Sequence, residues 1–495
     1  MVSDCLFCRK RRLFLASCFT FLLVHLYKFT NYLPNGDSMY GMEIGKLGMS
    51  HFGRWFSGIA EILTSSRYDL QWVSGIASSL FVGATVVIIL ELFSIDNKYL
   101  KAVSVLLFAA FPSMTATQTY SLWASAYMMG LFLSVLGVYI CVRHPEHFYL
   151  SIPCFTLSMG IYQIYILFAG AVAIYYFANL LLDSGETLGK HGKLIAKGAF
   201  SFASAGILYV LIDKVWRAFF NVTLGDYQGI SNAGKMSLNG IINGFVHMAK
   251  TSVRFFFPKG SFSFYGLINA LIILFTVVLV VWKIVLNGNY SLGRRILLCV
   301  LFLAVIPVTY AYYLAAEDVW YHTVMEIGNY LVYLIPVLIL NRNDSAVNAK
   351  TLLPVLTVLL GCLGLYHFVN DNVAYHQLHM SYERTRYQMT ETLLKVDSEN
   401  TAGLRKIAVF GNYPTADDGI QSIPRLVGAG TDSFIVSQHH FINFAKYYMN
   451  REFVGSTDEE KSAIEKTEQY AAMSAYPYGN YVSVIDDTLV IKLPE

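Results

Sequence analysis

Long apolar runs separated by short polar turns dominate the first 370 residues of the chain. The first run, 13–29, follows a basic cluster at 9–12 directly, and no small-residue cleavage site comes after it. This pattern predicts a retained membrane helix, not a removed signal peptide. Further apolar runs predict helices at 70–93, 99–114, 124–142, 148–159, 164–182, 199–212, 264–286, 296–314, 328–340 and 351–369. Several of these are shorter than the roughly 20 residues that a perpendicular span needs, so we expect broken or buried helices among them.

The charges of the short loops orient these helices. Lysine and arginine gather in every second loop, on the side of the N-terminus: Lys98, Lys101, Arg143, Lys190, Lys193, Lys197, Lys283, Arg294, Arg295, Arg342 and Lys350. Loops with such an excess stay in the cytoplasm. We therefore predict a cytoplasmic N-terminus, with the loops 31–68 and 213–263 and everything beyond residue 370 on the outer side.

The composition changes near residue 370, where the chain becomes charged and polar. A helical stretch and two strand-like runs are predicted there, at 382–396, 406–410 and 481–492. Between them, 434–453 mixes aromatic and polar residues at roughly helical spacing. A tail of this length can bury its own core. The predicted fold is an all-α membrane domain of about eleven spans, residues 1–370, followed by a small α/β domain, residues 371–495.

Composition narrows the classes of function. Residues are 55% hydrophobic and 14% charged, which excludes a single water-soluble core, since soluble chains are about a quarter charged. Net charge is only +3, and no long lysine or arginine block exists, so no nucleic-acid partner is expected. Of the seven cysteines, Cys5 and Cys8 alone make a weak metal or redox signal, and we expect free thiols in a cytoplasmic tail.

The first outer loop carries two carboxylates close to the membrane, Asp37 and Glu43, in a Gly-rich and aromatic stretch. A carboxylate so near to lipid is costly unless it is solvated, paired or used. In one interpretation Asp37 caps a helix at 42–62 that lies along the membrane surface. In the other, Asp37, or Glu43 in second place, is a general base that faces a cavity.

Cationic residues on the same side are candidates for binding a phosphate. They are Arg54, Arg217, Arg254, Lys259 and His322, each near a predicted helix end. Taken singly, each is also explained as a side chain that reaches toward lipid headgroups. Together they favour an anion site on the outer face, because a lipid-phosphate leaving group needs charge stabilisation.

Two further groups of residues on the outer side have candidate roles. The turn at 160–163 interrupts two weak apolar runs, so Tyr162 and Gln163 either bind polar ligand groups in a cavity or pack between helices. Near the next outer turn, three carboxylates are candidates for a base or for holding a divalent cation: Glu317, Asp318 and Glu326. No Walker lysine motif, dinucleotide glycine fingerprint, zinc-binding His-Glu-x-x-His or Gly-x-Ser-x-Gly elbow occurs, so a cytosolic nucleotide is not the expected substrate.

These features resemble the GtrII-type serotype-converting glucosyltransferases, which are membrane enzymes that modify bacterial O-antigen. The residues that carry the resemblance are Asn35-Gly36-Asp37, Gly53-Arg54-Trp55, Ser158-Met159-Gly160-Ile161-Tyr162-Gln163, Ala475-Tyr476-Pro477-Tyr478-Gly479-Asn480 and the strands after them through Lys492-Leu493. The likeness covers nearly the whole chain, and the closing segment is its most specific part.

The resemblance implies a GT-C-like architecture in the bacterial inner membrane, with the C-terminal domain in the periplasm. It implies transfer of a glucosyl group from polyprenyl phosphate glucose to O-antigen repeat units of lipopolysaccharide. It also implies Asp37 as the acidic first-loop residue, and two partners, a flippase and a glycosyltransferase that loads the lipid carrier. Selection of the acceptor by the C-terminal domain would give Tyr476, Tyr478 and Lys492 a role; a buried strand lysine in an ordinary small domain is the alternative for Lys492.

Functions of other classes fit part of the same pattern. A lipid-linked sugar transporter or flippase also has many spans and broken helices, although it commonly contains an internal repeat that this chain lacks. A polymerase or ligase of the same polysaccharide would share the topology and the substrates. Product size separates the latter from a glucosyltransferase, which adds one sugar per repeat.

Overall fold

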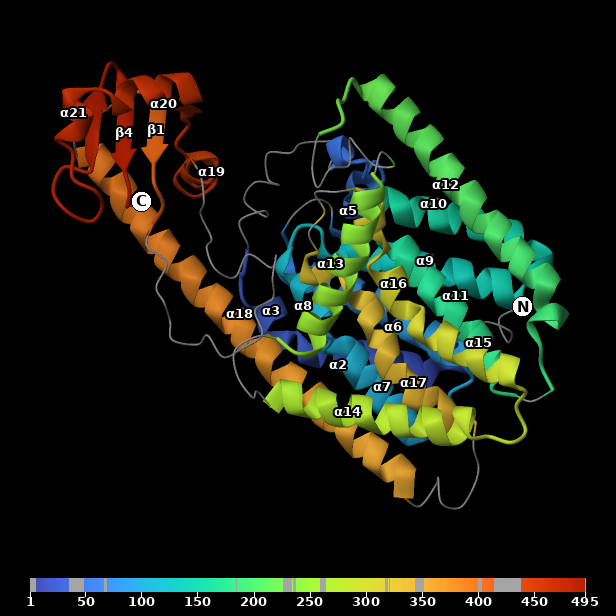
Figure 1. The fold of residues 1–495 in the computed structure, drawn as a ribbon. Helices are drawn as coiled ribbons and strands as arrows, with labels where there is room; N and C mark the ends of the chain where they lie inside the picture. Colours follow the sequence, from blue (N-terminus) through green and yellow to red (C-terminus); the bar gives the residue numbers. More distant parts are fainter. Residues whose placement is uncertain are drawn as a thin grey trace.

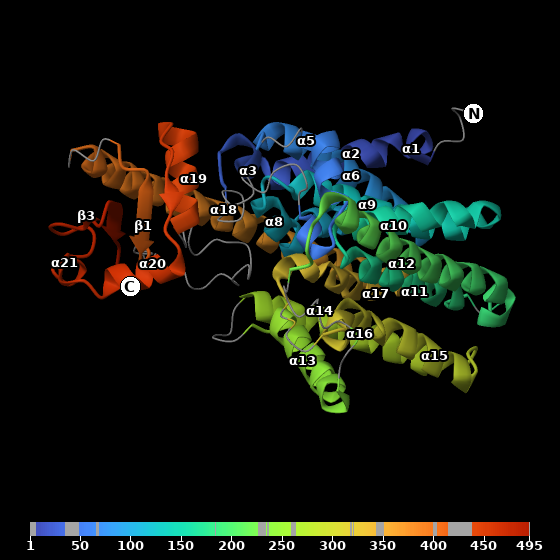
Figure 2. The same cartoon turned by 90° about the horizontal axis from the view of Figure 1, so that it is seen from above.

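The computed structural model (Figure 1) describes residues 6–34, 49–65, 69–183, 185–225, 234, 237–258, 264–316, 319, 321–342, 351–398, 403–413 and 438–494. These residues form a mostly helical protein with a small sheet near the C-terminus. In Figure 2, α13, α14 and α15 make one side of the helical part, and α1, α2, α5 and α6 make the other.

The helices before the sheet are α1 (Leu6–Arg9), α2 (Arg11–Val24), α3 (Leu26–Thr30), η3 (Ser50–Phe52), α5 (Ser57–Ser65), α6 (Gln71–Leu92), α7 (Lys98–Ala109), α8 (Pro112–Thr119), α9 (Ala124–Arg143), η4 (Pro145–Leu150), α10 (Ser151–Ile161), α11 (Tyr165–Leu181), η5 (Leu188–His191), α12 (Gly192–Phe220), α13 (Leu238–Phe256), α14 (Phe264–Val280), η7 (Val281–Val285), α15 (Leu292–Leu303), α16 (Val305–Thr309), η8 (Ala311–Leu314), η9 (Thr323–Met325), η10 (Ile327–Asn329), α17 (Tyr330–Asn341) and α18 (Leu353–Ser398). Each predicted apolar run overlaps at least one of these helices, so the helical prediction is confirmed.

Seven described helical segments are long and apolar enough to cross a membrane: Gln71–Leu92, Lys98–Thr119, Ala124–Arg143, Leu188–Phe220, Phe264–Val285, Leu292–Thr309 and Leu353–Val396. Two shorter apolar helices, Tyr165–Leu181 and Ile327–Asn341, accompany them. The protein is therefore a membrane protein. The count of about eleven spans and the orientation stay predictions.

Two helices continue past their predicted ends. α12 was expected to stop at residue 212, yet it runs to Phe220, because Asp213 and Arg217 form an ion pair one helical turn apart. α18 is one continuous helix through residue 370, where the composition changes, and it includes the helical stretch predicted at 382–396. The proposed boundary between the two domains thus lies inside α18.

The sheet contains β1 (Lys406–Phe410), β2 (Val454–Gly455), β3 (Val482–Ile485) and β4 (Thr488–Lys492) in the order β2-β1-β4-β3. β1 is parallel to both its neighbours, whereas β3 and β4 form an antiparallel hairpin. Its turn residues Asp486 and Asp487 both have positive φ, as a two-residue type I′ turn requires. The strands predicted at 406–410 and 481–492 are confirmed.

Three helices complete the region around the sheet: α19 (Gln438–Met449), α20 (Asp458–Glu465) and α21 (Glu468–Ala471). Met389 and Leu393 of α18 join Phe441 of α19 and residues of the strands in one buried cluster. In Figure 1 this sheet region lies at the far end of α18, apart from the packed helices. We call it the sheet domain.

Candidate functional site

A sharp turn at Gly53 positions the second half of the first outer loop. Gly53 has a φ of 72°, and a Cβ there would lie 2.6 Å from the hydroxyl oxygen of Tyr209. Tyr209, on α12, donates to the Gly53 carbonyl at 3.0 Å. Gln163 Nε2 donates to the Phe52 carbonyl and to the Tyr209 hydroxyl, both at 2.9 Å. The turn is therefore attached to α12 and to the break between α10 and α11.

The same turn also packs on Gly160 at the end of α10. The backbone N–H of Phe56 donates to the Gly160 carbonyl at 2.8 Å. A Cβ at Gly160 would come within 2.9 Å of both Phe56 and the Trp55 ring. The Gly53-Arg54-Trp55 run and the 160–163 turn thus pack directly on one another. The sequence had suggested them as two separate features.

Arg54 is held at this junction by aromatic residues. Its Nη1 donates to the Tyr127 hydroxyl at 3.1 Å, and its Cζ lies 4.4 Å from the centroid of the Tyr162 ring. The Tyr127 and Tyr162 rings stack with centroids 5.2 Å apart. A guanidinium stacked in this way keeps its charge and the planar array of donors that suits a phosphate. Tyr127 lies inside the apolar run of α9 and was not among the predicted site residues.

A cavity of about 210 Å³ opens beside Arg54. Its wall includes Arg54, Tyr162, Gln163, Leu167, Tyr312 and Met325. We call it the Arg54 cavity. Most of the wall is apolar, so the cation acts where water screens it little.

His322 lies close to the Arg54 cavity, just before η9. Its side chain is buried, and burial together with the positive charge of Arg54 lowers its pKa to about 4. The imidazole is therefore neutral at neutral pH and is not a second cation in the site. The sequence suggested a cationic role for His322, but it did not indicate that the side chain is buried.

Glu326, one turn farther along, is fully buried and binds Tyr310. The Tyr310 hydroxyl donates to Glu326 Oε1 at 3.0 Å and accepts from Asn329 Nδ2 at 2.7 Å. Burial raises the pKa of Glu326 to about 8, although the hydrogen bond from Tyr310 opposes this. Glu326 is thus protonated at neutral pH, which makes it a poor base and a poor ligand for a divalent cation.

The other candidate cations lie outside the cavity wall. Arg217 pairs with Asp213 through both Nε and Nη2 at 2.9 Å, so its charge is neutralised at the end of α12. Arg254 is exposed near the end of α13. Among the cations of the described wall, Arg54 alone faces the cavity.

Several predicted site residues fall outside the described residues: Asp37, Glu43, Lys259, Glu317 and Asp318. The general base and the carboxylates considered for a divalent cation therefore remain predictions. Within the described ranges, no three His, Cys, Asp or Glu side chains come together as a metal site. α5, in the stretch expected to lie along the membrane surface, buries Glu61 and packs against α6 and α9.

A buried lysine near the end of the first apolar run was not among the predicted site residues. Lys28 is 2% exposed, and its ammonium donates to the Leu33 carbonyl at 2.9 Å, to Ser121 Oγ at 2.7 Å and to Gln71 Oε1. Gln71 in turn donates to Asp69 at 2.6 Å, and Asp69 attracts Lys28 electrostatically. A lysine inside the first apolar run was the available signal.

This arrangement connects the two ends of the segment that contains Arg54. Leu33 precedes the segment and Asp69 follows it, and both are linked to the one ammonium of Lys28. We call Lys28, Leu33, Asp69, Gln71 and Ser121 the Lys28 cluster.

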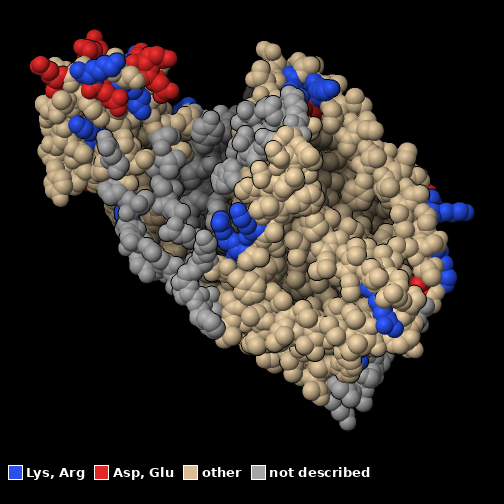
Figure 3. All heavy atoms as spheres, viewed as in Figure 1, with Lys and Arg blue, Asp and Glu red and all other residues tan. Residues whose placement is uncertain are grey.

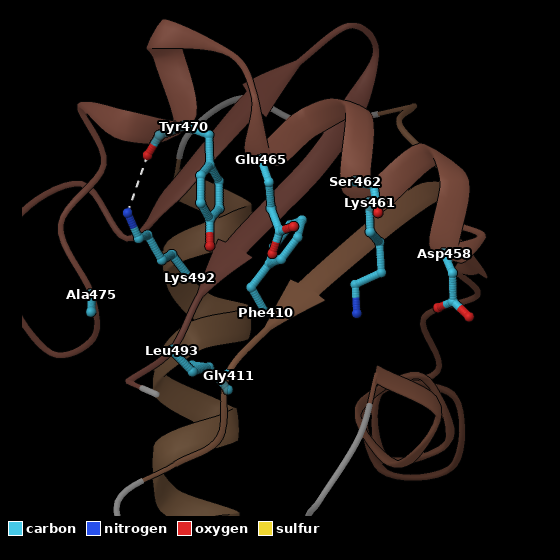
Figure 4. Close-up of a pocket in the computed structure, with 10 residues that line it drawn as sticks. All are labelled: Phe410, Gly411, Asp458, Lys461, Ser462, Glu465, Tyr470, Ala475, Lys492 and Leu493. Atoms are coloured by element: carbon cyan, nitrogen blue, oxygen red, sulfur yellow. Dashed lines mark hydrogen bonds between the residues drawn. The ribbon is translucent and has the colours of Figure 1, made fainter.

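The three candidates in the sheet domain have different surroundings. Tyr476 is buried and donates to Glu391 of α18 at 2.9 Å, so it attaches the sheet to that helix. Tyr478 is 76% exposed. Lys492 donates to the carbonyls of Tyr470 and Met473 at 3.2 and 3.0 Å, beside a second cavity shown in Figure 4.

The chain matches a known protein family. A family model described as glucosyl transferase GtrII matches residues 26–340. That range contains the Lys28 cluster, the Gly53 turn, Arg54, the 160–163 turn and Glu326, whereas α18 and the sheet domain follow it. No curated protein and no solved structure matches the chain.

Proposed function

The chain belongs to the GtrII glucosyl transferase family, and from this premise we propose that it transfers a glucosyl group from polyprenyl phosphate glucose to O-antigen repeat units of lipopolysaccharide. The modification would change the serotype of the cell. Membership supports a glucosyltransferase, and the apolar helices support an enzyme of the membrane. The lipid donor and the acceptor are the parts that we propose.

The observation that carries the proposal is Arg54 in the wall of a mostly apolar cavity. The Tyr127 hydroxyl and the Tyr162 ring hold its guanidinium in place. A polyprenyl phosphate has an apolar chain next to an anionic group, and the cavity presents surfaces for both. A nucleotide sugar would need many more polar contacts than this wall provides.

In the proposed reaction, a hydroxyl oxygen of the acceptor attacks the anomeric carbon of the donor glucose. The bond between that carbon and the phosphate oxygen breaks, and the electron pair leaves with polyprenyl phosphate. Arg54 stabilises the negative charge that develops on the phosphate. Asp37, with Glu43 as second candidate, accepts the hydroxyl proton. Direct displacement inverts the configuration of the anomeric carbon.

Two titratable side chains near Arg54, His322 and Glu326, carry no charge in this step. A charged His322 would add a second positive charge beside the phosphate, and an ionised Glu326 would repel the phosphate. Burial keeps both uncharged at neutral pH. Arg54 is therefore the charged side chain that a phosphate would meet in the described wall of the cavity.

The test is transfer of labelled glucose from synthetic polyprenyl phosphate glucose to O-antigen in membranes that carry the protein. Arg54→Met should lower kcat by about 100-fold or more, by analogy with loss of one oxyanion donor. Arg54→Lys should recover only part of it, because lysine lacks the planar donors. Arg254→Gln is the matched control and should leave transfer unchanged.

Four outcomes would overturn the proposal. Full transfer by Arg54→Met would exclude Arg54 as the phosphate residue, and full transfer by Asp37→Asn would exclude that base. No transfer by the wild type, with lipid-linked sugar crossing the bilayer instead, would favour a transporter. Growth in chain length without added glucose would favour a polymerase or ligase.

The setting of this reaction is also part of the proposal. The basic loops favour a cytoplasmic N-terminus in the bacterial inner membrane, which would put the sheet domain in the periplasm. A flippase and a glycosyltransferase that loads the carrier would supply the donor. Labelling of single cysteines placed at Tyr478 and Lys10 with an impermeant reagent tests the orientation.

A further inference from the structure

The sheet domain contacts the helical part at the start of the segment that contains Arg54. The Tyr448 hydroxyl, on α19, donates to the Tyr32 hydroxyl at 3.0 Å, although the two residues are 416 positions apart. The Tyr32 ring also meets the Tyr382 ring of α18 edge to face, with centroids 5.4 Å apart. Figures 1 and 2 show α19 on the side of the sheet domain that is turned toward α3, which ends just before Tyr32. We call these three residues the tyrosine contact.

Two neighbouring residues at this point pack in different directions. Tyr32 packs against the buried cluster that α18, α19 and the strands share. Leu33 is fully buried against Tyr375 and Leu378 of α18. The backbone is extended at Asn31, and consecutive side chains of an extended chain point to opposite sides. The start of the Arg54 segment is thus held by the sheet domain on one side and by α18 on the other.

The tyrosine contact is connected to the Lys28 cluster. The Leu33 carbonyl accepts from Lys28 at 2.9 Å, so the residue after Tyr32 already belongs to that cluster. Burial raises the pKa of Asp69 to about 6, and the charge of Lys28 and the hydroxyl of Tyr32 both act against this rise. Because Tyr448 donates to it, the Tyr32 hydroxyl can still direct its own hydrogen toward Asp69. A chain of polar contacts therefore runs from α19 to both ends of the Arg54 segment.

The sheet domain is attached to α18 by other residues as well. Met389 and Leu393 of α18 lie in its buried cluster, and Tyr476 donates to Glu391 of the same helix at 2.9 Å. The charged side chains that Figure 3 shows on this domain gather at its upper end, where α20 and α21 lie. Tyr448 is 40% exposed, so loss of its hydroxyl leaves little buried polar surface unsatisfied. Removal of that hydroxyl should therefore leave the domain folded and attached.

We infer that Tyr448 and Tyr32 are positioning residues for glucosyl transfer, through which the sheet domain holds the start of the Arg54 segment in place. The inference rests on the proposed function, in which Arg54 stabilises the departing phosphate. Neither tyrosine lines the described wall of the Arg54 cavity, so each acts through the Lys28 cluster. A loosened contact misplaces the guanidinium in the transition state and lowers kcat. The KM of the donor stays unchanged, because the mostly apolar wall still binds the lipid.

The first experiment compares the transfer kinetics of Tyr448→Phe and Tyr32→Phe with those of wild type in the full-length protein. Both variants keep the ring and lose the hydroxyl. Each should lower kcat by about three- to tenfold, tenfold being equivalent to about 1.4 kcal/mol, with an unchanged KM for the lipid donor. Tyr32→Phe should have the larger effect, because it also loses the interaction with Asp69. Tyr387→Phe, at a tyrosine of α18 that is 68% exposed, is the matched control and should change neither value.

A double variant tests whether the effect passes through the Lys28 cluster. In a Lys28→Met background, Tyr448→Phe should lower kcat by less than about twofold, because the connection that it acts through is already broken. Losses of kcat that multiply in full would overturn the inference.

Amide hydrogen exchange of the detergent-solubilised protein separates this inference from the proposed function, since it needs no transfer. The backbone N–H groups of Phe52, Gly53 and Phe56 are hydrogen-bonded within the Gly53 turn or to Gly160. The two hydroxyl variants should speed exchange at 49–56 by about threefold or more, with unchanged exchange in β1 and β4. The control variant should exchange as wild type does.

The outcomes distinguish the two claims. Faster exchange at 49–56 in a protein that transfers no glucose would support the positioning role and refute the proposed reaction. Normal transfer with unchanged exchange at 49–56 would overturn the positioning role alone. Faster exchange in β1 and β4 without a change at 49–56 would also overturn it, because the hydroxyls would then only stabilise the sheet domain. A fall in kcat without faster exchange at 49–56 would equally count against it.

Discussion

Replacing Lys28 by methionine removes the one ammonium that connects the two ends of the segment containing Arg54. Methionine has a similar length and no charge, so it fills the space of the lysine side chain. The Leu33 carbonyl, Ser121 and Gln71 nevertheless lose their donor. Asp69 loses its nearby positive charge. The change therefore tests the Lys28 cluster with little change in packing.

The magnitude follows from burial. Lys28 is 2% exposed, and removal of one partner from a buried, hydrogen-bonded charge pair typically costs about 3–5 kcal/mol. Each acceptor left without a donor contributes about 1–3 kcal/mol to such a cost. We expect Lys28→Met to lower the free energy of unfolding by about 3–5 kcal/mol and to lower kcat, because the ends of the Arg54 segment separate.

The assay is thermal or denaturant unfolding in detergent, followed by tryptophan fluorescence, together with glucosyl transfer well below the transition. Asp69→Asn added to Lys28→Met removes the carboxylate left alone, so the double variant should be less destabilised than the two single effects combined. Lys101→Met is the matched control. Its partner Asp96 is 83% exposed, and such a surface pair is worth about 1 kcal/mol or less.

A loss below about 1 kcal/mol for Lys28→Met, equal to that of Lys101→Met, would refute the reasoning, since it would put Lys28 in the class of surface ion pairs. Strictly additive effects of Lys28→Met and Asp69→Asn would show that the two residues do not interact. Lys28→Arg with normal kcat would be consistent with the cluster.

Three further predictions concern the residues near Arg54. Gly53→Ala should lower the free energy of unfolding by about 1–3 kcal/mol and should also reduce transfer. The added Cβ would meet the Tyr209 hydroxyl, and the φ of this residue is positive. Unchanged activity would contradict the packing of this turn on α12. Burial raises the pKa of Glu326 from 4.5 to about 8, so the folded protein holds a proton that the unfolded chain releases. Wild-type stability should then fall as pH rises from about 5 to about 8, by up to about 1.4 kcal/mol per unit, and Glu326→Gln should flatten the profile in denaturation experiments. Burial and Arg54 lower the pKa of His322 to about 4, so wild-type stability should fall as pH drops from about 6.5 to about 4, and parallel profiles for His322→Gln and wild type would argue against it.

Local patterns were sufficient for much of the fold. The apolar runs predicted the helices, because a chain in lipid must satisfy its backbone groups within each helix. The strands at 406–410 and 481–492 followed from short β-rich runs in a polar tail. The ends of α12 and α18 were harder to predict, since an ion pair one turn apart and a buried stripe allow a helix to continue through polar sequence.

The candidate site was predicted only in parts. Arg54, Tyr162 and Gln163 were each singled out by residue type and by their place next to an apolar run. The sequence did not indicate that the Gly53 turn docks on the 160–163 break, because residues about a hundred positions apart share no local signal. Tyr127 was hidden within the apolar run of α9.

What the sequence alone determined is the class of protein, a chain of membrane helices with a polar C-terminal region and the family to which it belongs. Only the tertiary structure decided the surroundings of each charge. Arg217 and Arg54 are alike in sequence, yet Arg217 lies beside Asp213 on α12 and Arg54 lies against Tyr127 and Tyr162 in the wall of a cavity. Likewise Glu326 and His322 are ordinary titratable residues until burial makes both neutral. Hydropathy is a property of a short stretch of chain, whereas the charge state of a side chain depends on neighbours that the fold brings from elsewhere.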